Sequence, residues 1–319
     1  MKILFVLLGL VLAAGASAQP AYPEKPVRVV SPFPPGGVAD TVARALAQKM
    51  TESFGRTALV ENRAGAGGTI GTDYVAKSPA DGYTLLVGNV STLAVAPGVY
   101  TKLPYNPAQD FSPITLVGRS PIVFAVHPSV PAKTPKELIA LARAHPGKMT
   151  FGSSGAGSIT HFAGELLNAA GKVNITHVPY KGAAPVIQAM LSGEVDMGSL
   201  QVLETLPHKN SGRLRIIAVS GTQRSAAMPD VPTAGELGLR GLEATVWYCV
   251  VGPRGMPQTV VKTLNATLSK AITSADFVKR FTADGVIPEP TTPEELATLI
   301  RTDIQRWAEV AKRTGVKLD

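Results

Sequence analysis

The sequence predicts an α/β fold of two domains, each a largely parallel sheet flanked by helices. Strand-like and helix-like runs alternate along nearly the whole chain, which is the pattern of α/β layers. The 319 residues, less a short expected leader, are more than one hydrophobic core usually organises. Two glycine-rich loops each lead from a strand into a helix, and such loops lie at the carboxyl ends of parallel strands.

The first 18 residues carry the features of a secretory signal peptide. Lys2 precedes an apolar run from Ile3 to Ala14, which is shorter than the ~20 residues that a membrane-spanning helix needs. Ala16-Ser17-Ala18 then supplies the small-residue pattern of a cleavage site. No cysteine follows the run, so we expect a protein without a lipid anchor that is exported to the periplasm or outside the cell.

Composition favours a globular protein that does not bind nucleic acid. Hydrophobic residues make up 45% of the chain, and the formal net charge is +8. The basic residues are scattered, with few aromatic residues among them, so the charge indicates only a mild preference for anions. The single cysteine, Cys249, excludes an internal disulfide and lies in a strand-like run, where a small buried apolar residue is expected.

In the first 120 residues, short apolar runs predict strands, and longer runs with apolar residues every three or four positions predict helices. In chain order we expect a strand at Val27–Val30, a helix at Ala39–Phe54, a strand at Ala58–Glu61, a helix at Gly71–Lys77 and a strand at Tyr83–Gly88. Two prolines and two glycines separate the first strand from the first helix and form a sharp loop there.

Residues 121 to 220 continue the same alternation. The helix expected at Pro135–Ala144 is well marked, because Thr134 can cap it and Glu137 stands at its third position. The other expected elements are, in order, the strands Ile122–His127 and Thr150–Gly152, the helix Ser158–Ala170, the strand Asn174–Val178, the helix Ala184–Ser192 and the strands Val195–Gly198 and Leu214–Val219.

The C-terminal part begins with a strand expected at Thr245–Val251 and ends in a helical tail. Thr292, Pro293 and Glu295 repeat the capping pattern. One face of the helix that follows is apolar and carries Leu296, Leu299, Ile300, Ile304, Trp307 and Val310.

Two apolar segments that run into proline-containing loops predict where the chain passes between domains. We place these crossings near Arg119–Ile122 and Ala244–Tyr248. Domain one then comprises residues 23–120 plus 247–319, and domain two comprises residues 121–246. Two crossings favour a hinge between the domains.

The two glycine-rich loops match each other in design. Glycine loop one is Pro34–Gly37, before a helix at Val38, and glycine loop two is Gly152–Ser158, before the helix that carries His161. Two helix N-termini facing each other across a cleft bind an anion through free N–H groups. The alternative is that both loops are ordinary turns. A carboxylate at Asp40 repels an anion, so we expect it to organise its loop rather than to contact the ligand.

Neither loop matches a nucleotide-binding motif. No lysine follows Gly37, as a P-loop requires, and the glycines of Gly65–Gly71 miss the dinucleotide fingerprint by one position. The five histidines are spread out without the spacing of metal ligands. We therefore expect no cofactor and no metal.

A secreted serine hydrolase is a less favoured alternative. It would use Ser154 or Ser158 with His161, but alanine at position 156 breaks the G-x-S-x-G pattern of a nucleophile elbow. No pair of carboxylates indicates acid–base catalysis. We expect a binding protein and not an enzyme.

Six segments, in order, resemble the signatures of a known receptor family. They are YPEKPVRVVSPFPPGGVAD, VENRAGAGGTIGTDYVAKSPADGYTLLVG, TFGSSGAGSITHFAGELL, VPYKGAAPVIQAMLSGEVDM, AAMPDVPTAGELG and VVGPRGMP. Over about residues 22–319 the chain is similar to the Bug receptors, the extracytoplasmic solute receptors of tripartite tricarboxylate transporters. The resemblance implies a two-domain periplasmic binding protein, a Venus flytrap of type II, that holds its ligand in the interdomain cleft without catalysis.

The resemblance also implies a ligand and its partners. Family ligands are mostly small carboxylates: dicarboxylates, tricarboxylates, acidic amino acids, nicotinate or aromatic acids. The positions that match the family's site are Phe33, Pro35, Gly36, Gly37 and Asp40, then Ser91 and Thr92, then Ser153, Ser154, Gly157, Ser158 and His161, with Lys181 either near the cleft or solvated in a turn. A monomer is expected to deliver the ligand to the permease subunits of the transporter or, alternatively, to present it to a membrane sensor kinase.

Departures from the family pattern concern the far end of the ligand, which is the end away from the carboxylate that the two glycine loops would hold. Leu93 stands where histidine is common, and Leu200 stands where the family often has an aspartate that would pair with a ligand amino group. The absence of that aspartate argues against an α-amino acid. An apolar far end, formed by Leu93, Leu200 and Tyr248, favours an aromatic or aliphatic carboxylic acid. Core packing is the alternative for Leu93 and Tyr248.

Overall fold

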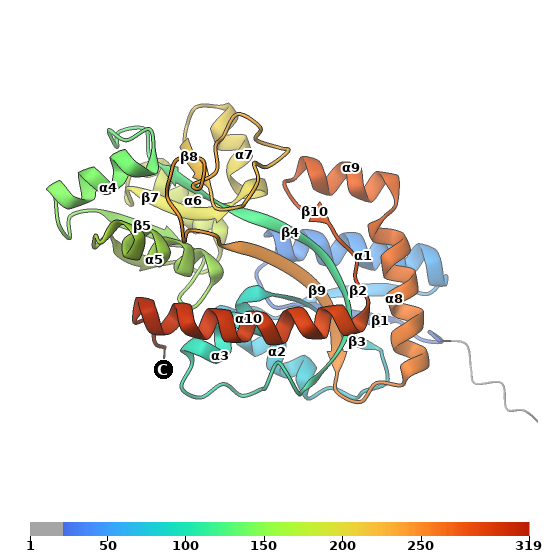
Figure 1. Ribbon diagram of the computed structural model, residues 1–319. Helices are drawn as coiled ribbons and strands as arrows, with labels where there is room; N and C mark the ends of the chain where they lie inside the picture. The colour runs from blue at the N-terminus through green and yellow to red at the C-terminus, as the bar shows by residue number, and fades with distance from the viewer. Residues whose placement is uncertain (1–21, 319) are drawn as a thin grey trace, which may run out of the picture.

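The computed structural model describes residues 22–318, and the expected signal peptide at residues 1–18 lies outside them. Helices and strands alternate through this part of the chain, which confirms the α/β class (Figure 1). No helix within it combines the length and the apolar character needed to cross a membrane.

Within residues 22–318, ten strands form one sheet in the order β2-β1-β3-β9-β4-β7-β5-β6, while β8 and β10 pair with β4 outside this path. β1 is parallel to β2 and β3, and β5 is parallel to β6 and β7. β4 and β9 run antiparallel to their neighbours. The strands are β1 Val27–Ser31, β2 Ala58–Asn62, β3 Thr84–Asn89, β4 Phe111–Val126, β5 Thr150–Ser153, β6 Thr176–Pro179, β7 Met197–Gln201, β8 Arg215–Val219, β9 Thr245–Pro253 and β10 Ile287–Pro288.

We describe the sheet as two lobes joined by β4 and β9 (Figure 1). Lobe one contains β1, β2, β3 and β10 with the first part of β4, and lobe two contains β5 to β8 with its last part. The predicted crossings near Arg119–Ile122 and Ala244–Tyr248 fall on these two paired strands, apart from Ala244, which directly precedes β9, and Ser120 is opposite Val246. The exact domain boundaries stay a prediction.

The helices cover the sheet and support both lobes. They are α1 Val38–Phe54, α2 Thr69–Ala76, α3 Ala96–Val99, α4 Pro135–Ala144, α5 Ile159–Gly171, α6 Ala183–Ser192, α7 Val202–Asn210, α8 Gln258–Ile272, α9 Ala275–Ala283 and α10 Pro293–Thr314. The long α10 runs across the lower part of Figure 1, with α2 and α3 drawn beneath it, and its Trp307 packs edge-on against Phe162 of α5, with ring centroids 5.8 Å apart. This C-terminal helix therefore contacts α5 of lobe two.

β4 shows how the core is built from alternating side chains. Ile122, Phe124 and Val126 belong to the large core cluster, whereas Val123 and Ala125 belong to a second cluster in lobe two. Because successive side chains of a strand point to opposite faces, this segment is buried on both sides.

Most expected elements are confirmed, but β4 and α7 differ. β4 begins at Phe111 and not at Ile122. Its Pro113 argues against a strand in the sequence, but it lies at a register shift against β9, where a strand tolerates proline. α7 was not expected, since Gln201 is an uncommon capping residue and Pro207 lies inside the helix. The expected burial of Cys249 is confirmed.

Candidate functional site

A cavity of about 160 Å³ lies between the two lobes. Lobe one contributes glycine loop one, the first turn of α1 and residues at the end of β3. Lobe two contributes Ser154 of glycine loop two, the first turns of α5 and α7, and the β6–α6 loop, while β9 contributes Val246 and Tyr248. The two glycine loops therefore meet at one cavity although they are far apart in the sequence.

Glycine loop one presents free backbone N–H groups to this cavity. Gly36 has φ +86°, a left-handed conformation that glycine adopts without strain. The first helical hydrogen bond of α1 runs from the Thr41 N–H to the Gly37 carbonyl oxygen at 3.0 Å. The N–H groups of Gly37, Val38 and Ala39 have no acceptor among residues 22–318, and these residues line the cavity. The helix N-terminus thus offers donors and a partial positive charge to an anion.

Asp40 holds glycine loop one in shape. Its carboxylate is buried: Oδ2 accepts from the Gly36 N–H at 3.0 Å and from Arg44 Nε at 2.9 Å, and Oδ1 accepts from Asn62 Nδ2 at 2.9 Å. Burial raises the pKa of Asp40, but these hydrogen bonds outweigh it, so the pKa lies below its usual value. Asp40 does not line the cavity, which is consistent with a carboxylate that organises the loop.

Glycine loop two uses most of its donors internally. Its hydrogen bonds run from the Ser154 N–H to Thr160 Oγ1 (2.9 Å), from the Gly155 N–H to Ser153 Oγ (3.2 Å), from the Gly157 N–H to His161 Nδ1 (3.3 Å) and from the His161 N–H to the capping Ser158 Oγ (3.2 Å). The two loops were expected to match in design, but they differ in how many of their N–H groups are free to bind an anion. In this structure the free donors named above belong to Gly37 of glycine loop one and to the first turn of α1.

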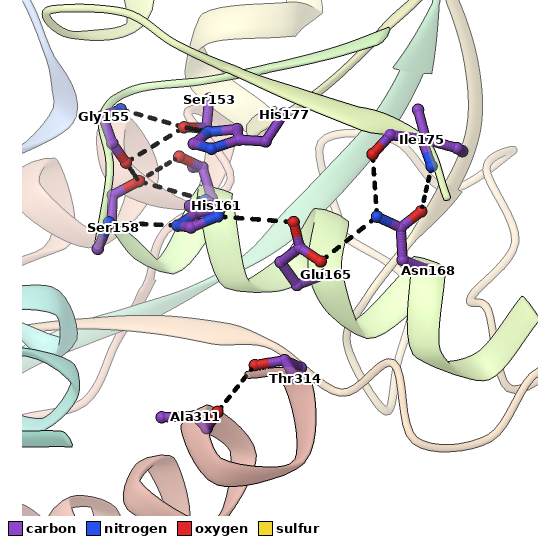
Figure 2. A network of polar contacts seen from close by, with 12 residues as sticks. Ser153, Gly155, Ser158, His161, Glu165, Asn168, Ile175, His177, Ala311 and Thr314 are labelled. Atoms are coloured by element: carbon purple, nitrogen blue, oxygen red, sulfur yellow. Dashed lines mark hydrogen bonds and ion pairs between the residues drawn. The ribbon is translucent and has the colours of Figure 1, made fainter. Parts of the chain in front are cut away.

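Two stacked imidazole rings lie beside glycine loop two (Figure 2). The ring centroids of His161 and His177 are 3.8 Å apart, and the ring planes differ by 11°. His177 Nε2 lies 2.6 Å from Ser153 Oγ, and His161 Nε2 lies 3.6 Å from Glu165 Oε1. Burial, together with the neighbouring His161, lowers the pKa of His177 to about 3. His177 is therefore neutral at physiological pH.

A hydrogen bond joins the lobes beside the cavity. The Ile159 N–H, at the first position of α5, donates to Ser91 Oγ at 3.0 Å. Gly182 of lobe two also lies close to glycine loop one, since a β-carbon added to it would be only 3.5 Å from Pro34 Cγ. Ser91 begins a π-helical turn, and the Asn89 side chain accepts from its N–H at 3.0 Å. The two lobes are therefore in contact in this structure.

Gln201, Glu204 and Tyr248 form a polar surface of the cavity, here called the α7 wall. The Gln201 N–H donates to Glu204 Oε2 at 2.9 Å as part of a capping box. The Tyr248 hydroxyl donates to Gln201 Oε1. Burial raises the pKa of Glu204 to about 7, with the hydrogen bond from Gln201 opposing the shift. Burial and the Glu204 carboxylate hold the pKa of Tyr248 well above its usual value.

The expectation of an apolar far end is corrected by this wall. Leu93 and Leu200 are fully buried in the core and do not line the cavity. Because side chains alternate along a strand, Leu200 packs into the lobe-two core while the adjacent Gln201 lines the cavity. Tyr248 does line the cavity, but its hydroxyl makes that surface polar.

The other predicted site residues fall into two groups. Those that line the cavity are Phe33, Pro35, Gly36, Gly37, Ser91, Ser154 and Lys181. Those that do not line it are Asp40, Thr92, Ser153, Gly157, Ser158 and His161, which form hydrogen bonds that shape the surrounding loops. Contact of either group with a ligand stays a prediction.

Sequence reasoning missed four polar residues of the cavity, namely Asn89, Thr160, Gln201 and Glu204. The Q-x-x-E spacing of Gln201 and Glu204 is a capping-box signal that could have located the start of α7. Asn89 ends β3 and accepts from the N–H groups of Ser91 and Thr92, which is the behaviour of a turn-capping asparagine.

Among residues 22–318, Ser154, Ser158 and His161 do not form the catalytic arrangement of a serine hydrolase. The His161 ring accepts from the Gly157 N–H and faces Glu165, and it contacts neither the Ser154 nor the Ser158 hydroxyl. Residues 22–318 also hold no group of three histidine, cysteine, aspartate or glutamate side chains that could bind a metal ion.

Comparisons with known proteins extend this description. The family model described as the tripartite tricarboxylate transporter family receptor matches residues 42–316. The protein BugT of Bordetella pertussis is 38% identical over 320 residues, which cover 99% of this chain and 98% of BugT.

Two solved structures share the fold along nearly their whole length. Rpa4515 of R. palustris, solved with adipate, is 34% identical with a TM-score of 0.89, and the match covers 93% of this chain and 99% of that one. MatC (Rpa3494) of Rhodopseudomonas palustris, solved with bound malate, is 35% identical with a TM-score of 0.86, and the match covers 91% of this chain and 99% of that one.

These matches establish both the fold and the class of protein. The fold is that of the α/β periplasmic binding proteins, and the family consists of transporter receptors that bind solutes without catalysis. The hydrolase alternative is therefore wrong. This chain belongs to the tripartite tricarboxylate transporter receptor family, the Bug receptors, and is a solute-binding receptor.

Proposed function

We propose that this receptor captures a small carboxylic acid in the cavity between its lobes and delivers it to the membrane permease of a tripartite tricarboxylate transporter. The observation that carries the proposal is the set of free N–H groups on Gly37, Val38 and Ala39, which line the cavity at the N-terminus of α1. Backbone donors in this arrangement stabilise a carboxylate without a charged side chain.

The ligands of solved relatives support a carboxylate. Rpa4515 was solved with adipate and MatC with malate, and both are dicarboxylates. We therefore assign the ligand of this chain to the small carboxylic acids, a class that includes dicarboxylates, tricarboxylates and aromatic carboxylates. The compartment in which the receptor meets it is the periplasm, after removal of the signal peptide.

Capture is a closing motion of two domains, residues 23–120 plus 247–319 and residues 121–246. β4 and β9 supply the two connections, and the hydrogen bond between Ser91 and Ile159 forms only when the lobes are together. This contact supports a closed state in which both glycine loops border one cavity.

A panel of small acids, each beside its neutral amide, tests the ligand class by isothermal calorimetry and thermal shift. We expect at least one acid to bind and its amide to bind about 100-fold more weakly, because the amide lacks the negative charge that the helix N-terminus stabilises. Equal binding of acid and amide would overturn the carboxylate assignment.

Delivery to a permease needs a separate experiment. Uptake of the labelled acid is measured in cells that carry the permease with and without this receptor. Uptake that depends on the receptor supports transport. Uptake that is unchanged, together with an acid-dependent response of a membrane kinase, would favour the sensor alternative.

A further inference from the structure

Glu204 is the acidic side chain of the cavity, and half of its carboxylate is committed to the protein. Oε2 accepts the Gln201 N–H at 2.9 Å, whereas no donor among residues 22–318 reaches Oε1. The adjacent Tyr248 hydroxyl donates to Gln201 Oε1 and not to Glu204. One carboxylate oxygen of the α7 wall is thus available to a group on the ligand.

No cation of the protein neutralises this carboxylate. Among residues 22–318, Glu204 forms no ion pair. Lys181 and Tyr248 are the other ionisable side chains that line the cavity, and Lys181 is exposed.

The described elements packed against α7 add no free cation beside Glu204, and the turn before β10, where Gly285 packs against Val202, carries the acidic Asp284. β7 and α6 carry no ionisable residue, and the one charged residue of β4, Arg119, pairs with Glu289 at 2.6 Å. On α7 itself, His208 and Lys209 lie in the last turn, away from the first-turn Glu204. The α7 wall is therefore negative whenever Glu204 is ionised, while the start of α1 is the positive part of the cavity.

We propose that Glu204 determines the second functional group of the ligand and selects a hydrogen-bond donor, an ammonium or a hydroxyl group, over a second ionised carboxylate. The inference rests on the proposed function, because it takes the first carboxylate to lie at glycine loop one. A donor would satisfy the available oxygen of Glu204, whereas a second carboxylate would meet a like charge at the α7 wall.

The protonation of Glu204 gives this selectivity a pH dependence. Burial raises the pKa of Glu204 to about 7. Above that pH the ionised side chain accepts a hydrogen bond and attracts an ammonium group. Below it the protonated side chain donates to a carboxylate, so the preference for a donor-bearing ligand weakens as the pH falls.

The experiment compares matched acids that differ only at one end. Calorimetry measures binding of 6-aminohexanoate, 6-hydroxyhexanoate and adipate, and of the corresponding four-carbon acids, to the full mature chain at about pH 6.5 and about pH 8.5. In this range the ammonium group of the ligand stays charged and both of its carboxyl groups stay ionised, so the pH dependence tests Glu204, the acidic side chain that lines the cavity. Glu204→Gln is the test variant, because glutamine keeps an acceptor for the Gln201 N–H. Glu243→Gln, at an exposed position, is the matched control.

At about pH 8.5 we expect the unaltered receptor to bind the amino or hydroxy acid about tenfold tighter than the dicarboxylate of the same length. At about pH 6.5 we expect the difference between these two affinities to be smaller. Glu204→Gln removes most of the preference and its pH dependence, and Glu243→Gln changes neither.

Two results would overturn the inference, and they differ from a failure of the proposed function. Tighter binding of the dicarboxylates at about pH 8.5 contradicts it while leaving a carboxylate receptor. A donor preference that persists in the folded Glu204→Gln variant, or that is independent of pH in the unaltered chain, also contradicts it. If no acid binds more tightly than its amide, the proposed function fails and the inference fails with it.

Discussion

The hydroxyl group of Ser91 in lobe one accepts a hydrogen bond from the backbone N–H of Ile159, the first residue of α5 in lobe two, at 3.0 Å. The bond links two segments far apart in the sequence at the edge of the cavity, and it occupies an N–H group that a helix start would otherwise offer to a ligand. Glycine loop two is thus positioned by a contact between lobes, while Gly37 and the first turn of α1 supply the free donors.

Replacing Ser91 with alanine removes this contact between lobes. The bond forms only in the proposed closed form, so its loss destabilises that form and not the open one. We therefore expect Ser91→Ala to weaken ligand affinity by about 5-fold to 10-fold, the equivalent of ~1 kcal/mol. Calorimetry with the best acid of the panel measures the change. Ser211→Ala, at an exposed position outside the cavity, is the control. Unchanged affinity in Ser91→Ala would show that the bond does not contribute to closure.

A charge placed at Gly37 tests glycine loop one directly. Gly37 has φ −79°, and a β-carbon added there would meet nothing closer than 3.9 Å, so both aspartate and asparagine fit the backbone as helix caps. We expect Gly37→Asp to reduce carboxylate affinity by more than about 100-fold, because the side chain repels the ligand. Gly37→Asn, which has nearly the same shape, should cost much less. Similar losses of affinity in both variants would indicate that the added side chain excludes the ligand sterically and not by its charge. Normal binding by a folded Gly37→Asp would falsify the assignment of the ligand carboxylate to glycine loop one.

Local signals explain why much of the fold could be predicted from the sequence. Thr134 caps α4 by accepting the Glu137 N–H, and Thr292 with Glu295 forms a capping box at α10, as expected, since each cap involves residues only three positions apart. The first part of β4 was missed because its proline and glycine residues disfavour a strand locally, and pairing with β9 overrides that preference.

The sequence predicted those cavity residues that belong to a continuous motif, and it missed those that only the tertiary structure brings to the cavity. Glycine loop one was recognised because its glycines and the start of α1 are consecutive. Glu204, in contrast, has the sequence context of an ordinary helix-capping residue, and its place beside Tyr248 of β9 in the cavity arises only in the folded protein. Leu200 was misjudged for the same reason, because the register of β7 decides which side chain enters the core.

Stability in acid depends on His177. Burial, together with the neighbouring His161, lowers the pKa of His177 to about 3, below its value of about 6.5 in an unfolded chain. Between these two pH values the unfolded state binds more protons, so the free energy of unfolding decreases as the pH falls. We expect thermal unfolding to show a larger loss between about pH 7 and about pH 4.5 in the unaltered chain than in His177→Gln. His145→Gln, at an exposed position, should behave like the unaltered chain. Equal acid sensitivity in all three proteins contradicts the prediction.

Glu204 has the opposite effect on stability, and it acts without any ligand. Its pKa of about 7 in the folded protein lies above the usual value of 4.5, so the folded state retains a proton that the unfolded state has lost. The free energy of unfolding therefore decreases as the pH rises from about 4.5 to about 7, and the full penalty is present above that range. We expect Glu204→Gln to be more stable than the unaltered chain by about 1–3 kcal/mol at about pH 8, and equally stable at about pH 4. Urea unfolding at both pH values measures the difference, and a gain that is the same at both would mean that packing, and not the charge, is responsible.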